Sequence, residues 1–241
     1  MEKWEVNPKT NRTKHGQRRH HILAIAGQIV AAEGLEGLKL PVVAREVGIS
    51  TPALYRHFNS KEALVAELAL RVMDEIDEAL SVVEGEGGSG DFERLARFSG
   101  AYLELALMDP VTTVLLSTFV TDPRRLVTGP LSDEIWELAM RWWKMLEKAL
   151  NHCGVSSELI PDICWGLWTS LQGQLGAQKF AERRGDISVR RSAEFATFGI
   201  VSCFVQSSAG EDLLLWGKAF KDGATRLVEA QGGKKKWWEI D

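Results

Sequence analysis

One short stretch, residues 45–61, carries most of the structural information in this chain: Arg45-Glu-Val-Gly-Ile-Ser-Thr-Pro-Ala-Leu-Tyr-Arg-His-Phe-Asn-Ser-Lys61. Gly48 can adopt the left-handed conformation that ends a helix without steric cost. Thr51 is expected to cap the next helix, because Pro52 suits a first helical position that needs no backbone donor. The stretch therefore predicts the end of one helix, a sharp turn and a short second helix.

This second helix is expected to be only about two turns long, because Asn59, with an acid three residues later, predicts the start of a further helix. Leu54 and Phe58 are four residues apart and should both face inward. The residues left to face outward or to flank that face are Thr51, Ala53, Tyr55, Arg56 and His57. A short helix of this kind after a glycine turn is typical of the recognition helix of a helix-turn-helix.

The same residues resemble the signature of TetR/AcrR-type transcriptional regulators. The resemblance is carried by Gly48-Ile-Ser-Thr-Pro-Ala-Leu-Tyr-Arg-His-Phe-Asn-Ser-Lys-Glu62, above all by its Leu-Tyr-x-His-Phe core followed by Lys-Glu-x-Leu. It runs from about Arg18 to Leu68, roughly a fifth of the chain. It implies an all-α, TetR-like fold, with an N-terminal three-helix helix-turn-helix head and a larger C-terminal helical bundle.

The resemblance also implies which residues face DNA: Lys39, Thr51, Pro52, Ala53, Tyr55, Arg56, His57 and Lys61. Arg56 is the best candidate for reading a base, because a guanidinium can bond guanine with two donors. Tyr55 and His57 are expected to bond phosphates, with packing against the first helix as the alternative for Tyr55. Lys39 stands where many family members carry Thr or Ser, and we interpret it as a charged phosphate contact.

Charge is unevenly distributed along the chain. Residues 1–61 carry a net charge of +5, although the whole chain carries −4. A basic N-terminal region on an acidic remainder suits a protein that approaches DNA phosphates. Residues 1–16 are interpreted as a flexible basic arm that crosses DNA; a disordered tail without specific contacts is the alternative.

We divide the chain into this arm (1–16), a helix-turn-helix head (17–61) and a helical body for ligand binding and dimerisation (62–241). The expected helices lie near 17–33, 40–47, 60–83, 91–107, 110–121, 131–152, 156–184, 188–208 and 211–230. No apolar run of about 18 residues and no secretory signal is present, which favours a cytoplasmic protein without a membrane partner. The three cysteines lack the spacing of metal ligands, and neither a metal nor a cofactor is expected.

Aromatic and methionine side chains recur at helical spacing in the body. Such side chains around one or two polar groups are typical of a pocket for a hydrophobic small molecule, but they equally describe an ordinary core. The candidate ligand-binding residues are Tyr102, Met108, Phe119, Trp136, Met140, Trp143, Trp165, Trp168 and Gln172.

A stripe of small residues on helix 156–184 indicates close approach by another helix. By resemblance, two late helices pack with their copies in a second subunit as a four-helix bundle; packing within one chain is the alternative. The candidate dimer residues are Gly166, Ser170, Gly173, Ala177, Phe195, Phe198 and Val201.

Together these features predict a ligand-responsive, DNA-binding transcriptional regulator. We expect a repressor that binds a palindromic operator in double-stranded DNA as a homodimer and is released by a hydrophobic small-molecule effector. One alternative is an enzyme in the body, but no nucleophile beside a base, no paired acids and no phosphate loop are visible. The other is a protein-interaction module that uses its helix-turn-helix only for packing. The C-terminal Lys234-Lys-Lys-Trp-Trp238 could lie on a membrane surface or fold back onto the body.

Overall fold

The computed structural model describes residues 14–84, 90–121, 132–205, 209–232 and 236–239. These residues form eleven α-helices and no strand, so the predicted all-α fold is confirmed. The basic arm lies almost wholly outside the described residues. The head contains α1 (Lys14–Gly37), α2 (Leu40–Val47) and α3 (Thr51–Tyr55). The helices of the body are α4 (Lys61–Glu84), α5 (Asp91–Met108), α6 (Pro110–Thr121), α7 (Ser132–His152), α8 (Ile160–Gly176), α9 (Gln178–Arg184), α10 (Val189–Ser202) and α11 (Ala209–Gln231).

The turn between α2 and α3 forms as the sequence predicts. Gly48 has φ 72° and ψ 36°, and the backbone nitrogen of Ile49 bonds the Ala44 carbonyl at 2.9 Å, which closes the end of α2. Leu54 and Phe58 are fully buried. Inward packing of these two side chains therefore fixes which face of α3 is presented to solvent.

Both predicted helix caps are wrong by one residue. Ser50, not Thr51, caps α3, since its hydroxyl accepts a hydrogen bond from the Ala53 nitrogen at 3.3 Å. Ser60, not Asn59, caps α4 in the same way, through the Ala63 nitrogen at 3.1 Å. A cap must precede the first helical residue, and the helices begin at Thr51 and Lys61. α3 has five residues, fewer than two turns.

Two helix boundaries in the described chain differ from the prediction in an instructive way. Gly34, with φ 71° and ψ −174°, interrupts the first helix where the prediction ended it, and a short further helical segment runs to Gly37. The helix expected over 156–184 divides at Ala177 into α8 and α9. The division comes directly after Gly176 and close to Gly173, and two glycines in one turn weaken a helix.

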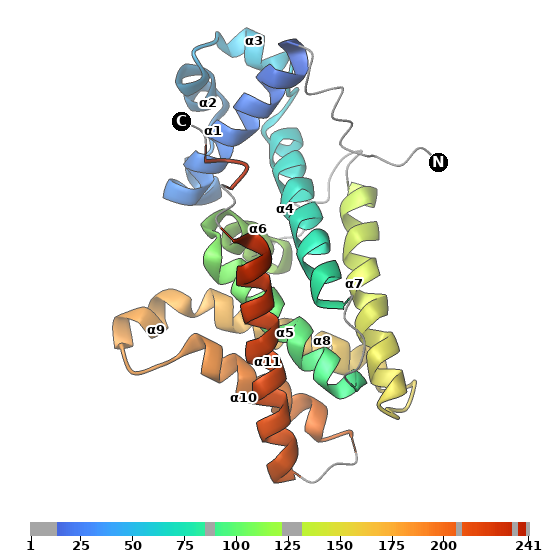
Figure 1. Cartoon of the computed structure of the whole chain (residues 1–241). Helices are drawn as coiled ribbons and strands as arrows, with labels where there is room; N and C mark the ends of the chain where they lie inside the picture. The colour runs from blue at the N-terminus through green and yellow to red at the C-terminus, as the bar shows by residue number, and fades with distance from the viewer. Residues whose placement is uncertain (1–13, 85–89, 122–131, 206–208, 233–235, 240–241) are drawn as a thin grey trace.

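The body is built around the packing of α5 on α11. Most of α5 is buried, including every residue from Leu95 to Ala106. The two backbones touch, because a Cβ added to Gly100 would lie 1.9 Å from the Phe220 carbonyl oxygen. In Figure 1, α4 leaves the head and runs down beside α7 into the body, and residues 236–239 lie against α1 of the head. One cluster of buried side chains is continuous through head and body.

None of the described helices is both long and apolar enough to cross a membrane. In the described part of the chain, no group of three or more His, Cys, Asp or Glu side chains is arranged to hold a metal ion. Burial raises the pKa of Cys153 to about 11 and that of Cys164 to about 12, so both thiols stay protonated near neutral pH.

Candidate DNA-reading surface and ligand cavity

The head presents α3 at the end of the molecule that lies away from the body (Figure 1). Three residues of this helix and its end are exposed to solvent: Pro52, Tyr55 and Arg56. The exposed fraction of Tyr55 is 49%. This exposure does not favour the alternative in which Tyr55 packs against the first helix. The other predicted positions on this helix and just after it, Thr51, Ala53 and His57, are partly buried.

Two lysines flank this surface in different ways. Lys39 is exposed in an extended conformation directly before α2, where it is free to approach a phosphate. Lys61 is partly buried, and its ammonium donates a hydrogen bond to the Leu35 carbonyl at 2.8 Å. The ammonium of Lys61 therefore ties the end of α1 to the start of α4, a structural role that the sequence did not indicate.

Arg19 on α1 supports the segment that follows α3 from inside the head. Its guanidinium lies 4.1 Å from the centre of the Phe58 ring and bonds Glu67 on α4, with Nε 2.9 Å from Oε1. Phe58 lies three residues after the end of α3, so this contact joins α1 and α4 to the turn that follows α3. Arg19 thus acts within the head.

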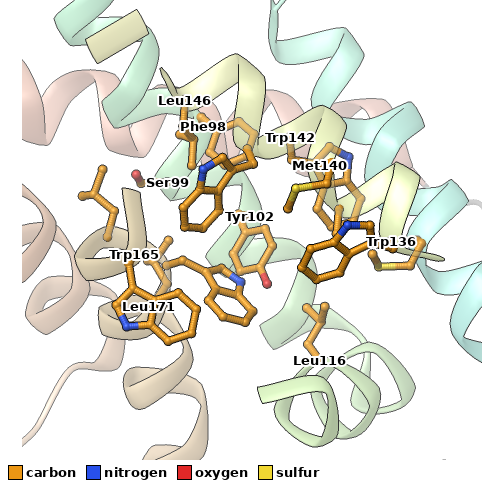
Figure 2. Close-up of a pocket in the computed structure, with 15 residues that line it drawn as sticks. Phe98, Ser99, Tyr102, Leu116, Trp136, Met140, Trp142, Leu146, Trp165 and Leu171 are labelled. Atoms are coloured by element: carbon orange, nitrogen blue, oxygen red, sulfur yellow. The ribbon is translucent and has the colours of Figure 1, made fainter. Parts of the chain in front are cut away.

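A cavity of about 320 Å³ opens inside the body between α4, α5, α6, α7 and α8 (Figure 2). Six of the predicted ligand-binding residues line it: Tyr102, Trp136, Met140, Trp143, Trp165 and Trp168. The tryptophans meet ring to ring, with ring centres 5.3 Å apart for Trp165 and Trp168 and 6.5 Å apart for Trp143 and Trp165. The wall is almost wholly apolar, and its aromatic rings converge on one space from three helices, α5, α7 and α8.

Three predicted ligand residues are placed differently. Met108 does not line the cavity and is 38% exposed, because six residues along a helix turn it well away from the face of Tyr102. Gln172 does not line the cavity either; it is buried and its amide donates to the Tyr102 hydroxyl at 2.6 Å. The side chain of Phe119 lies outside the described residues.

Several lining residues escaped the sequence analysis. The chief ones are Met73, Phe98, Ser99, Leu116, Trp142 and Leu171. The adjacent pair Trp142 and Trp143 was a usable signal, and both side chains reach the cavity. Phe98 lies one helical turn before the predicted Tyr102 and stacks on it, so this spacing was also a usable signal, whereas Ser99 gave none.

The Asp77 carboxylate, which lies beside the cavity, is already paired. The indole of Trp142 donates to Asp77 at 3.1 Å, and Arg141 donates to the same carboxylate at 2.6 Å. Burial raises the pKa of Tyr102, so this phenol stays protonated. No lining side chain of the described cavity carries a charge at neutral pH.

The predicted dimer residues divide into inward and outward groups. Val201 is fully buried and is corrected to a core position, whereas Phe198 is partly buried and packs against Phe92 and Trp216, with ring centres 6.4 and 6.2 Å apart. Gly166 approaches Ile200 of α10 within the same chain, at 3.7 Å from an added Cβ, and Ser170 is partly buried. The outward group is Gly173, Ala177 and Phe195.

Comparison with known proteins identifies relatives of the helix-turn-helix region and of the fold. Residues 22–68 match the family model described as bacterial regulatory proteins, tetR family. The chain is 30% identical over 91 residues to the uncharacterized HTH-type transcriptional regulator YobS of Bacillus subtilis (strain 168). That match covers 37% of this chain and 46% of YobS, about half of its length. The chain is also 24% identical over 158 residues to the HTH-type transcriptional regulator AcrR of Shigella flexneri, a match that covers 60% of this chain and 67% of AcrR.

The fold is similar to that of AibR, whose crystal structure was solved in complex with isovaleryl coenzyme A and operator DNA. The TM-score is 0.58 at 21% sequence identity, over 79% of this chain and 100% of AibR. At this identity the similarity establishes a shared fold.

Proposed function

The chain belongs to the TetR family of bacterial regulatory proteins, and from this premise we propose that it is a dimeric DNA-binding transcriptional repressor controlled by a hydrophobic small molecule. Regulators of this family are not enzymes. We place its action in the cytoplasm, where a bacterial operator is accessible. The proposed division remains a reading head over residues 17–61 and a regulatory body over residues 62–241.

One observation carries the proposal: a single helix links the DNA-reading surface to the cavity. α4 begins at Lys61, which is bonded to the head, and the same helix lines the cavity with Met73. It is also tied to α7 beside the cavity through Asp77 and Trp142. A ligand that moves α7 or α4 can therefore change the orientation of the head.

The proposed mechanism follows from this link. In the DNA-bound state, two copies of α3 enter successive major grooves of a palindromic operator, with Arg56 reading a base and Lys39 contacting the backbone. A ligand that binds better to a second orientation of α4 shifts the population toward it, and the two heads then no longer match the operator spacing. Its effect cannot exceed its difference in affinity between the two states.

The partners are proposed on similar grounds. Three exposed residues would form the centre of the dimer interface: Gly173 on α8, Ala177 at the end of α8, and Phe195 on α10. AibR, which shares the fold, binds operator DNA and isovaleryl coenzyme A. This supports the pairing of an operator with a small organic effector, while the cavity of the present chain decides which effector fits.

The test is selection of bound sequences from random duplex DNA at about 150 mM salt, because non-specific phosphate binding is weakened as salt rises. We expect a palindrome, with a half-site spacing that reports the distance between the two heads. Recovery of no motif, with and without a hexane extract of hydrophobic metabolites, would contradict specific DNA reading and favour a protein-interaction module.

A further inference from the structure

The cavity wall specifies the chemistry of its ligand more narrowly than hydrophobicity alone. Aromatic rings from three helices face one space, and flat rings stack on such side chains at centre distances of about 4.5–7 Å. The walls therefore favour a planar aromatic ligand over a flexible acyl chain.

Hydrogen bonding in the wall adds a polar requirement at one point. The Tyr102 oxygen accepts a hydrogen bond from Gln172 at 2.6 Å and a further one from Trp168. A phenol oxygen has two lone pairs, so both are used and the hydroxyl hydrogen remains available. Among the other polar lining groups, the Ser99 hydroxyl donates to the Leu95 carbonyl at 2.9 Å and the Trp142 indole donates to Asp77, so Tyr102 is the lining hydroxyl with a hydrogen to offer.

The wall also argues against a charged ligand. Aromatic faces attract cations, but a cation held in this cavity would lose its water without meeting a carboxylate, because the nearby Asp77 is bonded to Arg141 at 2.6 Å. An anion would meet no cationic side chain in the wall.

We propose that the effector is an uncharged planar aromatic molecule with one hydrogen-bond acceptor, such as a ring carbonyl, which accepts the hydroxyl hydrogen of Tyr102. This proposal rests on the proposed function only where it calls the ligand an effector. The chemical class of the ligand is inferred from the residues that line the cavity.

Three ring systems of similar size test the proposal by equilibrium dialysis: 9-fluorenone, fluorene, which lacks the carbonyl, and cationic 10-methylacridinium. We expect 9-fluorenone to bind the unchanged protein about three- to tenfold more tightly than fluorene, and at least about tenfold more tightly than the cation. Tyr102→Phe should remove the preference for 9-fluorenone over fluorene. Equal binding of 9-fluorenone and fluorene to the unchanged protein, or tighter binding of the cation, would overturn the ligand class.

The two proposals can fail separately in this experiment. If 9-fluorenone binds as expected but leaves the affinity for the selected operator unchanged, the ligand chemistry stands and the proposed ligand response does not. If an operator is found and the ring preferences are absent, only the ligand chemistry is overturned.

A second, independent observation concerns the C-terminal turn over residues 236–239. This turn closes on itself, because the Lys236 nitrogen bonds Glu239 Oε2 at 3.0 Å and the Glu239 nitrogen bonds the Lys236 carbonyl at 2.9 Å. In Figure 1 the segment lies against the head, far from the start of α11. Trp237 and Trp238 are both partly buried there.

The turn contacts the head and the body at once. On α1, a Cβ added to Gly27 would lie 2.6 Å from Trp238 Cβ, so the absence of a side chain at Gly27 is what lets the tail approach. On the body side, the Trp238 indole donates to Asp109 Oδ1 at 3.1 Å, and Asp109 is fully buried at the corner between α5 and α6. Asp109 also accepts from the Val111 nitrogen at 3.1 Å, which anchors the corner itself.

A third contact reaches α4. The Arg71 guanidinium lies 5.3 Å from the centre of the Trp237 ring, and its Nη2 lies 3.1 Å from His20 Nδ1 on α1. Arg71 is two residues from Met73, which lines the ligand cavity. The turn is thus attached to the helix that links the cavity to the DNA-reading surface.

We infer that residues 236–239 form a strap that holds the head in its DNA-binding orientation on the body. Removing the strap lets the head sample other orientations, so that only part of the population matches the operator and the apparent affinity falls by that fraction.

The test compares full-length protein with a chain lacking residues 236–241 and with a control lacking only 240–241. Gly27→Leu is a second way to displace the strap without altering it. We expect faster amide exchange in α1 around Gly27 and about three- to tenfold weaker operator binding for the long deletion and for Gly27→Leu. The control should behave as the full chain.

Two results would overturn the strap. Unchanged exchange in α1 would show that the turn does not hold the head, whatever the DNA result. Faster exchange with unchanged or tighter DNA binding would show that the held orientation is not the one that reads DNA. The exchange measurement needs no operator, so it remains decisive if the proposed function fails.

Discussion

Arg190 on α10 bonds the carboxylate of Glu104 on α5 through two hydrogen bonds of 2.6 Å, one to each oxygen. Glu104 is one of the few buried charged residues among those described, whereas much of Arg190 is exposed. The guanidinium therefore neutralises a carboxylate that would otherwise be buried alone, and it joins α10 to the centre of the body.

Arg190→Ala should lower the free energy of unfolding by about 2–3 kcal/mol, because it leaves the Glu104 carboxylate buried without its partner. The double change Arg190→Ala with Glu104→Met should recover most of this loss, since no charge then remains to be buried. Arg183→Ala on the exposed α9 is the matched control, with an expected change within about 0.5 kcal/mol. Urea unfolding at constant protein concentration measures all three. Equal destabilisation of the single and double variants would show that the loss comes from packing alone.

Gly100→Ala should destabilise the protein by about 2–4 kcal/mol, because the added methyl group would meet the Phe220 carbonyl oxygen at 1.9 Å and push α5 away from α11. Gly176→Ala is the natural comparison, since a Cβ there meets nothing within 4 Å. This second change should be neutral or stabilising by up to about 1 kcal/mol. Thermal unfolding of the two variants distinguishes them, and similar midpoints would mean that the two helices have room to separate.

Glu75 on α4 should make stability fall as pH rises through the neutral range. Burial raises the pKa of its carboxyl from 4.5 to about 7, an effect partly opposed by the nearby charge of Lys236. The folded chain therefore binds the proton more tightly than the unfolded chain does. The associated stability is fully present below pH 4.5 and is lost as pH rises to about 7.

The measurement is urea unfolding at about pH 5 and about pH 8 for the original protein and for Glu75→Gln. The original protein should lose about 1–2 kcal/mol more than the variant over this interval, less than the full linkage value because the carboxyl is partly solvated. Parallel losses in the two proteins would assign the pH dependence to other groups.

Arg56→Ala should weaken operator binding by about 1–3 kcal/mol and relax the sequence preference at one position of each half-site, if its guanidinium reads guanine. Lys39→Ala should weaken binding more evenly across sequences and reduce its salt dependence, as expected for a phosphate contact. Arg183→Ala removes one positive charge far from the head and serves as the control for net charge. Titrations in fixed salt distinguish these effects, and an Arg56→Ala variant that binds as well as the control would remove this residue from the reading surface.

Phe195→Glu should prevent dimerisation, because Phe195 lies at the proposed interface. The exposed fraction of Phe195 is 51% in the single chain. Leu214→Glu on α11 is the matched control, as that leucine is 76% exposed but lies outside the proposed interface. Sedimentation should give a monomer for the first variant and a dimer for the second. A dimeric Phe195→Glu variant would move the interface to another face.

The sequence by itself determined the features that depend on neighbouring residues. The turn at Gly48 follows from one left-handed glycine, and the exposed face of α3 follows from burial of Leu54 and Phe58 four residues apart. These interactions act within a few residues, so the local pattern contains their whole cause. Part of the aromatic wall on α7 was visible for the same reason, because Trp136 and Trp143 are seven residues apart and share one helical face.

Only the tertiary structure decided the features made by residues far apart in the chain. Trp238 and Asp109 are separated by 129 residues, and nothing in the sequence of either indicates the other. The contribution of Ser99 to the cavity was hidden because α5 is buried from Leu95 to Ala106, so that no single face of it is marked as the inner one. The buried side chain of Val201 was assigned to the dimer interface, since an apolar stripe looks the same whether it packs on its own chain or on a partner. Local backbone preferences thus specify the reading head, whereas the cavity, the strap and the face left open for a second subunit depend on how the helices pack.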